Sequence, residues 1–323
     1  IHVPYKGGRG NRFRLQNEAK TIAETLGGAG YDRVGFTISY VLHKNKGTGQ
    51  GFRVWKTPWP TDEWKKAQGR AAELTTDAAL AYLDSRGSEA EVEKGMEHYL
   101  LFLHYRCTHD PYIKHDEWDY GDKTVDRYDS ALSYCDDQIG RVFDAINDHR
   151  EAQNTAVILF SDHGELFGEH GLTNHGNSLF ETDVRVPLLV SVPGETVETV
   201  DVPVVLTDLA PTILDLAGQK VEKSDGWNLV PLLYEQKPHQ LYLRRPIYMF
   251  TDVQRGNVHY RAASIFRWPH KYIRDIRLGA EQVFDTLEDP DEKRDLSSIH
   301  PALRAAMAES VDSWLSTAKG VKP

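Results

Sequence analysis

The sequence predicts an α/β protein with a mostly parallel central sheet, helices on both faces of it, and a small α+β subdomain at the C-terminal end. Apolar runs of strand length, without polar alternation, recur through the first two thirds of the chain, which is typical of strands buried on both faces. Helical patterns separate these runs, and strands that alternate with helices form parallel sheets. After about Gly218 the pattern changes. We therefore expect an α/β domain at 1–218 and an α+β subdomain at 219–323.

The elements of the larger domain follow from hydrophobic periodicity. Helices are assigned where apolar residues recur every three or four positions, and strands where they run continuously. The clearest helix is Thr124–Arg150, whose apolar stripe runs from Tyr128 to Ile146. The expected order is a helix from Asn17 to Leu26, a strand at Arg33–Tyr40, a loop at Gly47–Pro60, a helix at Trp64–Asp84, a strand at Tyr99–Tyr105, the helix at Thr124–Arg150, strands at Thr155–Ser161 and Val186–Val192, and a helix at Leu206–Ala217.

The C-terminal subdomain is assigned from shorter patterns. Pro246–Asp252, His259–Phe266 and His270–Arg274 are strand candidates, and Pro301–Leu315 is a terminal helix. Strands that follow one another without intervening helices indicate an α+β arrangement.

Composition excludes several classes of protein. Lys and Arg number 38 and Asp and Glu 48, so the formal charge is 38 − 48 = −10, which argues against a nucleic-acid partner or an anionic membrane surface. No apolar run reaches the roughly 18 residues that indicate a membrane span. Two cysteines exclude a disulfide scaffold and a multi-cysteine zinc module. We predict that Cys107 and Cys135 are both packing residues.

Polar residues directly follow the strand Thr155–Ser161. In an open α/β sheet, ligands bind beyond the carboxyl ends of the strands. Asp162 and His163 lie at this position and are ordinary ligands for a divalent cation. Two alternatives are that Asp162 is the N-cap of a helix, and that nearby histidines form a structural zinc site, although no cysteine lies close enough to complete one.

Two further segments supply candidate substrate-binding and catalytic groups. His109 follows the strand Tyr99–Tyr105, where it either binds an anionic substrate, protonates a leaving group, or is an ordinary loop histidine. His175 and Asn177 follow a glycine-rich loop and are expected to face the same crevice. The aromatic residues Phe52, Trp55, Trp59 and Trp118 either stack on a sugar or aryl ring or pack in the core.

Taken in order, these segments resemble the sulfatase family of the alkaline phosphatase superfamily. The resemblance runs through nearly the whole chain. Its most specific part is the Asp-His-Gly-Glu string that begins at Asp162. The matching segments are Thr21–Leu26 with Ala29–Tyr31, Phe102–Tyr105 with His109–Tyr112, Ser161–Glu165 with Gly168–Gly171, Arg185–Leu188, Asp208–Thr212, and Val283–Asp285 with Glu288–Glu292 and Asp295–Leu296.

The resemblance implies a metal-dependent hydrolase of sulfate esters of small molecules or glycans. It implies that Asp162 and His163 bind a divalent cation, Ca²⁺ first and Mg²⁺, Mn²⁺ or Zn²⁺ as alternatives. His109 matches the substrate-binding histidine of the family. His175 lies near the position at which arylsulfatase-like members carry a substrate-binding lysine. An exported location, periplasmic or extracellular, or a lysosomal one is implied in the same way.

The chain also departs from the family pattern. Members carry two adjacent acidic metal ligands after their first strand and a nucleophile in a Cys/Ser-x-Pro-x-Arg string, and neither string occurs here. The only pair of adjacent aspartates, Asp136 and Asp137, lies on the exposed face of a predicted helix. The chain opens at Ile1 rather than at a methionine. We therefore expect the nucleophile, a formylglycine by resemblance, to lie upstream.

Two other functions stay open at the level of sequence. Arylsulfatase-like members often carry a lysine and a histidine at the strand exit where this chain has Phe36–Tyr40. Related branches of the superfamily act as phosphodiesterases, phosphonate monoester hydrolases or phosphoglycerol transferases. A second alternative is a catalytically inactive fragment, or a pseudoenzyme that binds a sulfated or phosphorylated glycan. The sequence predicts no particular oligomeric state.

Overall fold

The computed structural model describes residues 14–56, 68–86, 98–149, 151–195, 199–221, 224–234, 239–255 and 258–318. Contacts divide the chain into two compact units. The first consists of Ile1–Thr155 and Ala210–Asp225, and the second of Ala156–Leu209 and Gly226–Pro323. The division after residue 218 that we infer from the sequence stays a proposal about domain organisation.

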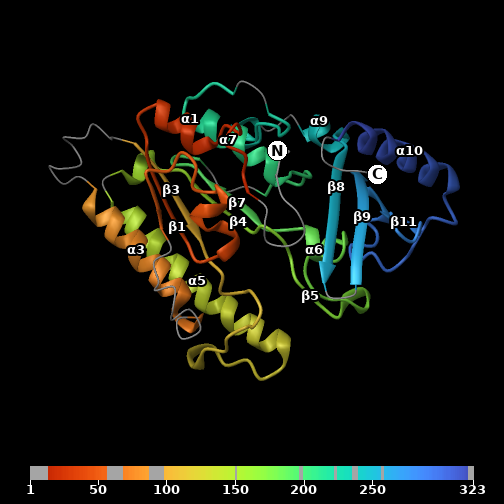
Figure 1. The fold of residues 1–323 in the computed structure, drawn as a ribbon, viewed down its shortest axis with the longest axis horizontal. Helices are drawn as coiled ribbons and strands as arrows, with labels where there is room; N and C mark the ends of the chain where they lie inside the picture. Colours follow the sequence, from red (N-terminus) through yellow and green to blue (C-terminus); the bar gives the residue numbers. More distant parts are fainter. Residues whose placement is uncertain are drawn as a thin grey trace. The chain divides into compact units, whose positions relative to one another are not determined.

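A parallel sheet forms the centre of the first unit (Figure 1). Its strands are β1 (Asp32–Thr37), β2 (Val54–Lys56) and β3 (Tyr99–His104), in the order β2-β1-β3. Both pairings are parallel, as the sequence predicts. Strand β2 lies within the segment Gly47–Pro60, which the sequence predicts to be a loop. A strand of three residues is too short to show a recognisable pattern of apolar residues.

Two helices, α3 (Ala71–Ser85) and α5 (Thr124–Asp148), pack side by side along this sheet (Figure 1). Val34 and Phe36 of β1 form a buried cluster with Ala79 of α3 and Val142 of α5. The predicted helix Thr124–Arg150 is therefore confirmed over Thr124–Asp148. Residues 64–67, with which the other predicted helix begins, lie outside the described residues.

The opposite side of β1 is covered by aromatic side chains. Trp55 stacks on Phe102 with ring centroids 5.6 Å apart, and Phe52 lies 4.7 Å from Trp55. A Cβ atom at Gly35 would collide with the Trp55 ring, so only glycine allows this close approach. Of the two alternatives for Phe52 and Trp55, the structure therefore favours core packing. Trp59 lies outside the described residues.

Helix α1 (Ile22–Gly28) begins later than the predicted start at Asn17. A capping box sets its first turn. The Thr21 hydroxyl accepts a hydrogen bond from the Glu24 amide at 3.1 Å, and the Glu24 carboxylate accepts one from the Thr21 amide at 2.8 Å. Because these bonds satisfy amides that the helix leaves unpaired, they place the helix end at Thr21.

The second unit contains both strands predicted in its first part. Strand β4 (Val157–Phe160) pairs with β7 (Leu188–Ser191), and this pair is antiparallel. Between them lies a hairpin of two very short strands, β5 (Leu166–Phe167) and β6 (Thr173–Asn174), which the sequence does not predict.

A four-stranded antiparallel sheet with one helix forms the C-terminal part of the second unit (Figure 1). The predicted strands correspond to β8 (Ile247–Arg255), β9 (Val258–Arg267) and β10 (His270–Asp275), and β11 (Glu281–Asp285) is an addition. The terminal helix α10 (Pro301–Thr317) packs against the sheet. The core between them consists of Ala263, Ile265, Tyr272, Val283, Leu296, Met307, Val311 and Leu315.

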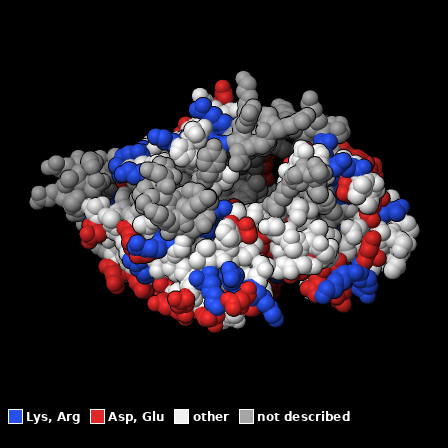
Figure 2. Space-filling view, turned by 60° about the horizontal axis from the view of Figure 1, so that its bottom comes forward, with Lys and Arg blue, Asp and Glu red and all other residues white. Residues whose placement is uncertain are grey.

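The remaining described helices are short: α6 (Glu181–Val184), α7 (Leu209–Leu216), α8 (Val230–Tyr234) and α9 (His239–Arg244). Among the described residues, no helix combines the length and apolar composition needed to cross a bilayer. On the face drawn in Figure 2, basic side chains lie in mixed clusters with acidic ones.

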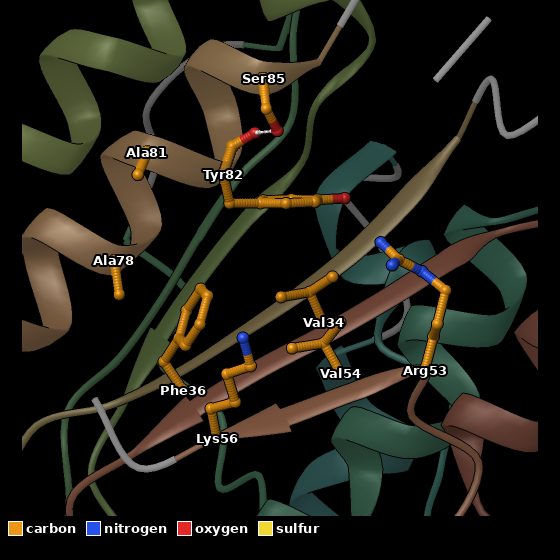
Figure 3. A pocket seen from close by; sticks show the side chains of 9 residues that line it. All are labelled: Val34, Phe36, Arg53, Val54, Lys56, Ala78, Ala81, Tyr82 and Ser85. Atoms are coloured by element: carbon orange, nitrogen blue, oxygen red, sulfur yellow. Dashed lines mark hydrogen bonds between the residues drawn. The ribbon is translucent and has the colours of Figure 1, made fainter. Parts of the chain in front are cut away.

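A cavity of about 410 Å³ lies in the first unit between α3, β1 and β2 (Figure 3). Its lining is mainly apolar, with Arg53 and Lys56 as its charged members. The Tyr82 ring lies over Val34 with its hydroxyl toward Arg53. None of the residues predicted to bind metal or substrate lines this cavity.

Candidate functional site

Asp162 and His163 directly follow strand β4, in a turn whose backbone is fixed by hydrogen bonds. The Ser161 hydroxyl donates to the His163 carbonyl at 2.8 Å, and the Gly164 amide donates to the Asp183 carbonyl at 2.8 Å. A Cβ atom at Gly164 would collide with the Thr182 carbonyl oxygen. Glycine is therefore required for the turn to pack this closely on α6.

The His163 ring is held in one tautomer. Its Nδ1 lies 2.8 Å from the Gly164 carbonyl oxygen. Because a carbonyl only accepts, the neutral form of this imidazole carries its proton on Nδ1 and its lone pair on Nε2. That Nε2 lies 3.7 Å from Asp162 Oδ1, and the Asp162 side chain is 70% exposed. The turn thus presents one imidazole nitrogen and one carboxylate side by side.

The alternative that Asp162 caps a helix is wrong. The next described elements are the hairpin strands β5 and β6 with one turn of 3₁₀ helix between them, and α6 begins only at Glu181. Asp162 therefore has no helix N-terminus within reach along the chain.

His175 lies against His163. The two imidazole rings stack with centroids 3.9 Å apart and planes 23° apart. His175 Nδ1 lies 3.2 Å from both carboxylate oxygens of Glu165, whose side chain is only 5% exposed. A buried carboxylate that accepts from Nδ1 fixes the orientation of the ring. The sequence alone gives Glu165 no role, although it belongs to the same Asp-His-Gly-Glu string as Asp162 and His163.

The loop that carries His175 and Asn177 is organised by Asp183. The Asp183 carboxylate is buried and accepts hydrogen bonds from the Gly176 amide at 2.9 Å, the Ser178 amide at 3.1 Å and the Ser178 hydroxyl at 2.9 Å. Asn177 donates from Nδ2 to the Thr173 carbonyl at 3.1 Å. Among the described residues, its buried Oδ1 has no hydrogen-bond partner. The same loop thus holds both predicted residues.

Helix α6 is anchored by a buried cluster of charges. Lys271 is fully buried and lies 2.7 Å from Glu181 and 3.0 Å from Glu292. The Glu181 amide also donates to the Glu292 carboxylate at 2.5 Å. Burial raises the pKa of Glu292, although the ammonium of Lys271 opposes this rise. The cluster fixes the helix that supplies Asp183 to the loop.

His170, the third histidine of the glycine-rich segment, packs elsewhere. Its ring stacks on Phe180 with centroids 3.7 Å apart, and burial lowers its pKa. Within the described ranges, no three or more His, Cys, Asp or Glu side chains converge in a way that could hold a metal ion. The arrangement therefore does not support a structural zinc site built from these three histidines.

His109 lies in the loop that follows β3, in the first unit. Its Nδ1 lies 2.7 Å from the Asp110 carbonyl oxygen, and Arg106 Nη2 lies 2.9 Å from Nδ1 and 3.2 Å from Nε2 of the same ring. Arg106 is half-buried, and burial lowers its pKa. A guanidinium and an imidazole in contact suit the binding of an anion. Its relation to Asp162, His163, His175 and Asn177 in the second unit stays a prediction.

The donor set at the end of β4 fits a divalent cation in part. Carboxylate oxygen and neutral imidazole nitrogen are both ordinary ligands, and the tautomer of His163 leaves the required lone pair on the side of Asp162. These two residues supply two ligands.

Comparison with known proteins decides the family. The family model for sulfatases matches residues 3–219. The chain belongs to the sulfatase family. A second family model, for the C-terminal part of N-sulphoglucosamine sulphohydrolase, matches residues 168–313.

The curated sulfatases that resemble this chain are considerably longer. A choline-sulfatase of Rhizobium meliloti is 30% identical over 174 residues, which cover 53% of this chain and 32% of that protein. Arylsulfatase K of Canis lupus familiaris is 29% identical over 198 residues, 59% of this chain and 37% of that protein. The match thus spans about a third of either relative.

Solved structures share the fold at low sequence identity. A 2-O GAG sulfatase superposes with a TM-score of 0.73 and 17% identity, over 95% of this chain and 76% of that one. A phosphonate monoester hydrolase from Silicibacter pomeroyi superposes with a TM-score of 0.73 and 15% identity, over 97% and 83%. The predicted alkaline phosphatase-like α/β fold is confirmed.

Proposed function

We propose that the protein represented by this chain is a metal-dependent hydrolase of sulfate esters. The observation that carries the proposal is the turn after β4, where Asp162 and the lone pair on His163 Nε2 lie side by side. Membership of the sulfatase family supports it, since sulfatases act with a divalent metal ion.

Each site residue receives a role in this proposal. Asp162 and His163 hold the cation, which neutralises negative charge on the ester oxygens when bound. His175, oriented by Glu165, binds the sulfate group or protonates the leaving oxygen. Asn177 binds substrate from the same loop. His109, in contact with Arg106, binds the anion or acts as the second acid.

The nucleophile belongs to the part of the protein upstream of Ile1 in this proposal. By resemblance it is a formylglycine in a Cys/Ser-x-Pro-x-Arg string, and two acidic metal ligands accompany it. The proposed location is exported or lysosomal. One relative that is 38% identical over 105 residues is described as an extracellular sulfatase homologue of Drosophila melanogaster.

The proposed substrates are sulfate esters of glycans or small molecules. One protein of the same fold was solved in complex with its substrate D-glucosamine-2-N,6-O-disulfate. A phosphate or phosphonate ester is the second candidate. In its favour, the exit of β1 offers the buried side chains Thr37, Ile38 and Ser39, with no lysine or histidine among them.

Cation binding to the full chain tests the metal site without reference to turnover. Titration calorimetry with Ca²⁺, Mn²⁺ and Zn²⁺ should give binding that Asp162→Ala weakens at least tenfold. The matched control is Asp136→Ala, which removes an exposed carboxylate from α5 and should leave the affinity unchanged. Equal affinities for both variants and the unsubstituted chain would refute the assignment. Calcium is the expected ion by resemblance, whereas tighter binding of Mn²⁺ or Zn²⁺ would reflect the imidazole ligand.

Activity assays separate the candidate reactions. The protein with its upstream segment should hydrolyse an aryl sulfate faster than an aryl phosphodiester, and His109→Ala and His175→Ala should each lower kcat/KM by about 10²-fold or more. A preference for the phosphodiester would favour the second candidate. Binding of a sulfated glycan without turnover of either ester would favour an inactive, glycan-binding protein.

A further inference from the structure

The two cysteines of the chain lie together in the first unit. Cys107 belongs to the loop that follows β3, and Cys135 lies on α5. Their Sγ atoms are 2.6 Å apart, although 28 positions separate the residues in the sequence. A disulfide bond is about 2.0 Å long. The two sulfurs are thus close to bonding distance with both thiols still free.

We propose that Cys107 and Cys135 form a redox pair that closes a disulfide between the β3 loop and helix α5. From the sequence alone, each cysteine is expected to be a packing residue. The sequence around each cysteine does not indicate that the two are neighbours, because they come together only when the loop folds onto the helix.

The surroundings of the pair favour its formation within the folded chain. Cys135 lies on the buried face of α5, whereas Cys107 is only partly buried. The neighbouring helix side chain Tyr134 is held by stacking on His115, with centroids 3.9 Å apart. Tyr105, two residues before Cys107, is held by a hydrogen bond of 2.9 Å between its hydroxyl and that of Thr76. Backbone on both sides of the pair is therefore anchored before any bond forms.

The reaction is a thiol–disulfide exchange with an external disulfide, such as oxidised glutathione. The Cys107 thiolate, the more accessible of the two, attacks one sulfur of the oxidant and releases one glutathione thiolate. The Cys135 thiolate then attacks Cys107 Sγ in the mixed disulfide and releases the second. The chain loses two electrons and two protons, and the oxidant becomes two thiols.

Contact with Cys135 and burial both raise the pKa of the Cys107 thiol. Since the thiolate is the nucleophile, oxidation of the folded chain should be slow at neutral pH and faster at alkaline pH. The same burial should make the Cys107–Cys135 disulfide slow to reduce.

The disulfide would restrain the loop after β3, which carries the proposed site residue His109. His109 lies two positions after Cys107, and its contact partner Arg106 lies one position before it. The disulfide would thus fasten the Arg106–His109 contact to α5. The redox proposal itself does not depend on sulfatase activity and is tested separately from it.

The full chain, purified reduced, provides the test. It is equilibrated in glutathione buffers of increasing oxidised fraction, quenched with N-ethylmaleimide and weighed intact by mass spectrometry. The expected result is a change from two alkylated thiols to none, with loss of two hydrogen masses. Peptide mapping of the oxidised chain should recover Cys107 linked to Cys135. Oxidation should raise Tm by on the order of 5 °C.

Cys107→Ser and Cys135→Ser are the matched controls. Each should keep a single thiol and show no oxidant-dependent shift in Tm. The proposal is refuted if both thiols of the folded chain remain alkylatable in fully oxidised glutathione. It is also refuted if the products are glutathione adducts or linked dimers only. Because peptide mapping uses the unsubstituted chain, the outcome does not depend on the variants folding.

Discussion

Replacement of Asp32 by asparagine should destabilise the first unit strongly. The Asp32 carboxylate is fully buried, accepts two hydrogen bonds of 2.6 Å from Arg53, and accepts a third of 3.0 Å from the Tyr82 hydroxyl. Asparagine has nearly the same shape but no charge. Arg53 would then lose its charged hydrogen bonds to this carboxylate. The Arg53 side chain is 34% exposed, so we expect the low end of the cost of breaking a buried pair, about 3 kcal/mol.

Asp77→Asn is the matched control. Asp77 also accepts from an arginine, Arg141, at 2.7 Å, but its side chain is 49% exposed. An exposed pair contributes less than about 1 kcal/mol. Urea unfolding at neutral pH should therefore give a loss about three times larger for Asp32→Asn than for Asp77→Asn. Equal losses for the two variants would refute the reasoning.

The pH dependence adds a second criterion. Burial alone would raise the pKa of Asp32, but the hydrogen bonds and charge of Arg53 outweigh burial and hold the pKa below its ordinary value of 3.8. A group with a lowered pKa stabilises the fold above its ordinary pKa, and this contribution is lost as the pH falls through the folded value. The difference between the unsubstituted chain and Asp32→Asn should hence be constant from pH 7 to about pH 5 and shrink below pH 3.8.

Two further predictions concern the turn that carries the proposed site and the buried charge cluster that anchors α6. Gly164→Ala should abolish cation binding in calorimetry and lower stability by roughly 1–3 kcal/mol, because the new methyl group collides with the Thr182 carbonyl; Gly140→Ala, with open space at the same atom, should change neither. Because the pKa of Glu292 is raised in the folded chain, the folded state binds more protons than the unfolded state above pH 4.5. The contribution of Glu292 to the free energy of unfolding should therefore fall as the pH rises from 4.5 through the pKa of the folded state. Glu292→Gln should flatten that slope in urea unfolding between pH 4 and pH 7, and an unchanged slope would contradict the role of burial.

Long and regular segments of the fold were predictable from sequence, and short ones were not. The continuous apolar run of β3 and the long stripe of α5 each contain enough residues to define their periodicity. Strand β2 has three residues, and each strand of the β5–β6 hairpin has two. Pairing with neighbours creates these strands, so their own residues carry little signal.

The same distinction applies to the candidate site. Position after a strand indicated Asp162 and His163, since the carboxyl end of a strand is a local feature of the sequence. The stacking of His163 on His175 and the burial of Glu165 depend on how the hairpin folds back. The three histidines of the glycine-rich segment look alike in the sequence, yet His170 packs on Phe180 instead.

The discontinuous path of the chain between the two units has a consequence for its synthesis. The first unit needs residues 210–225, which include most of α7, in addition to its first 155 residues. During translation, residues 156–209 of the second unit are therefore synthesised before residues 210–225, which complete the first unit. Domains of a multidomain chain commonly fold one after another from the N-terminus. The first unit of this protein cannot be completed before part of the second unit has been synthesised. The first unit waits as an incomplete nascent chain until residue 225 has left the exit tunnel.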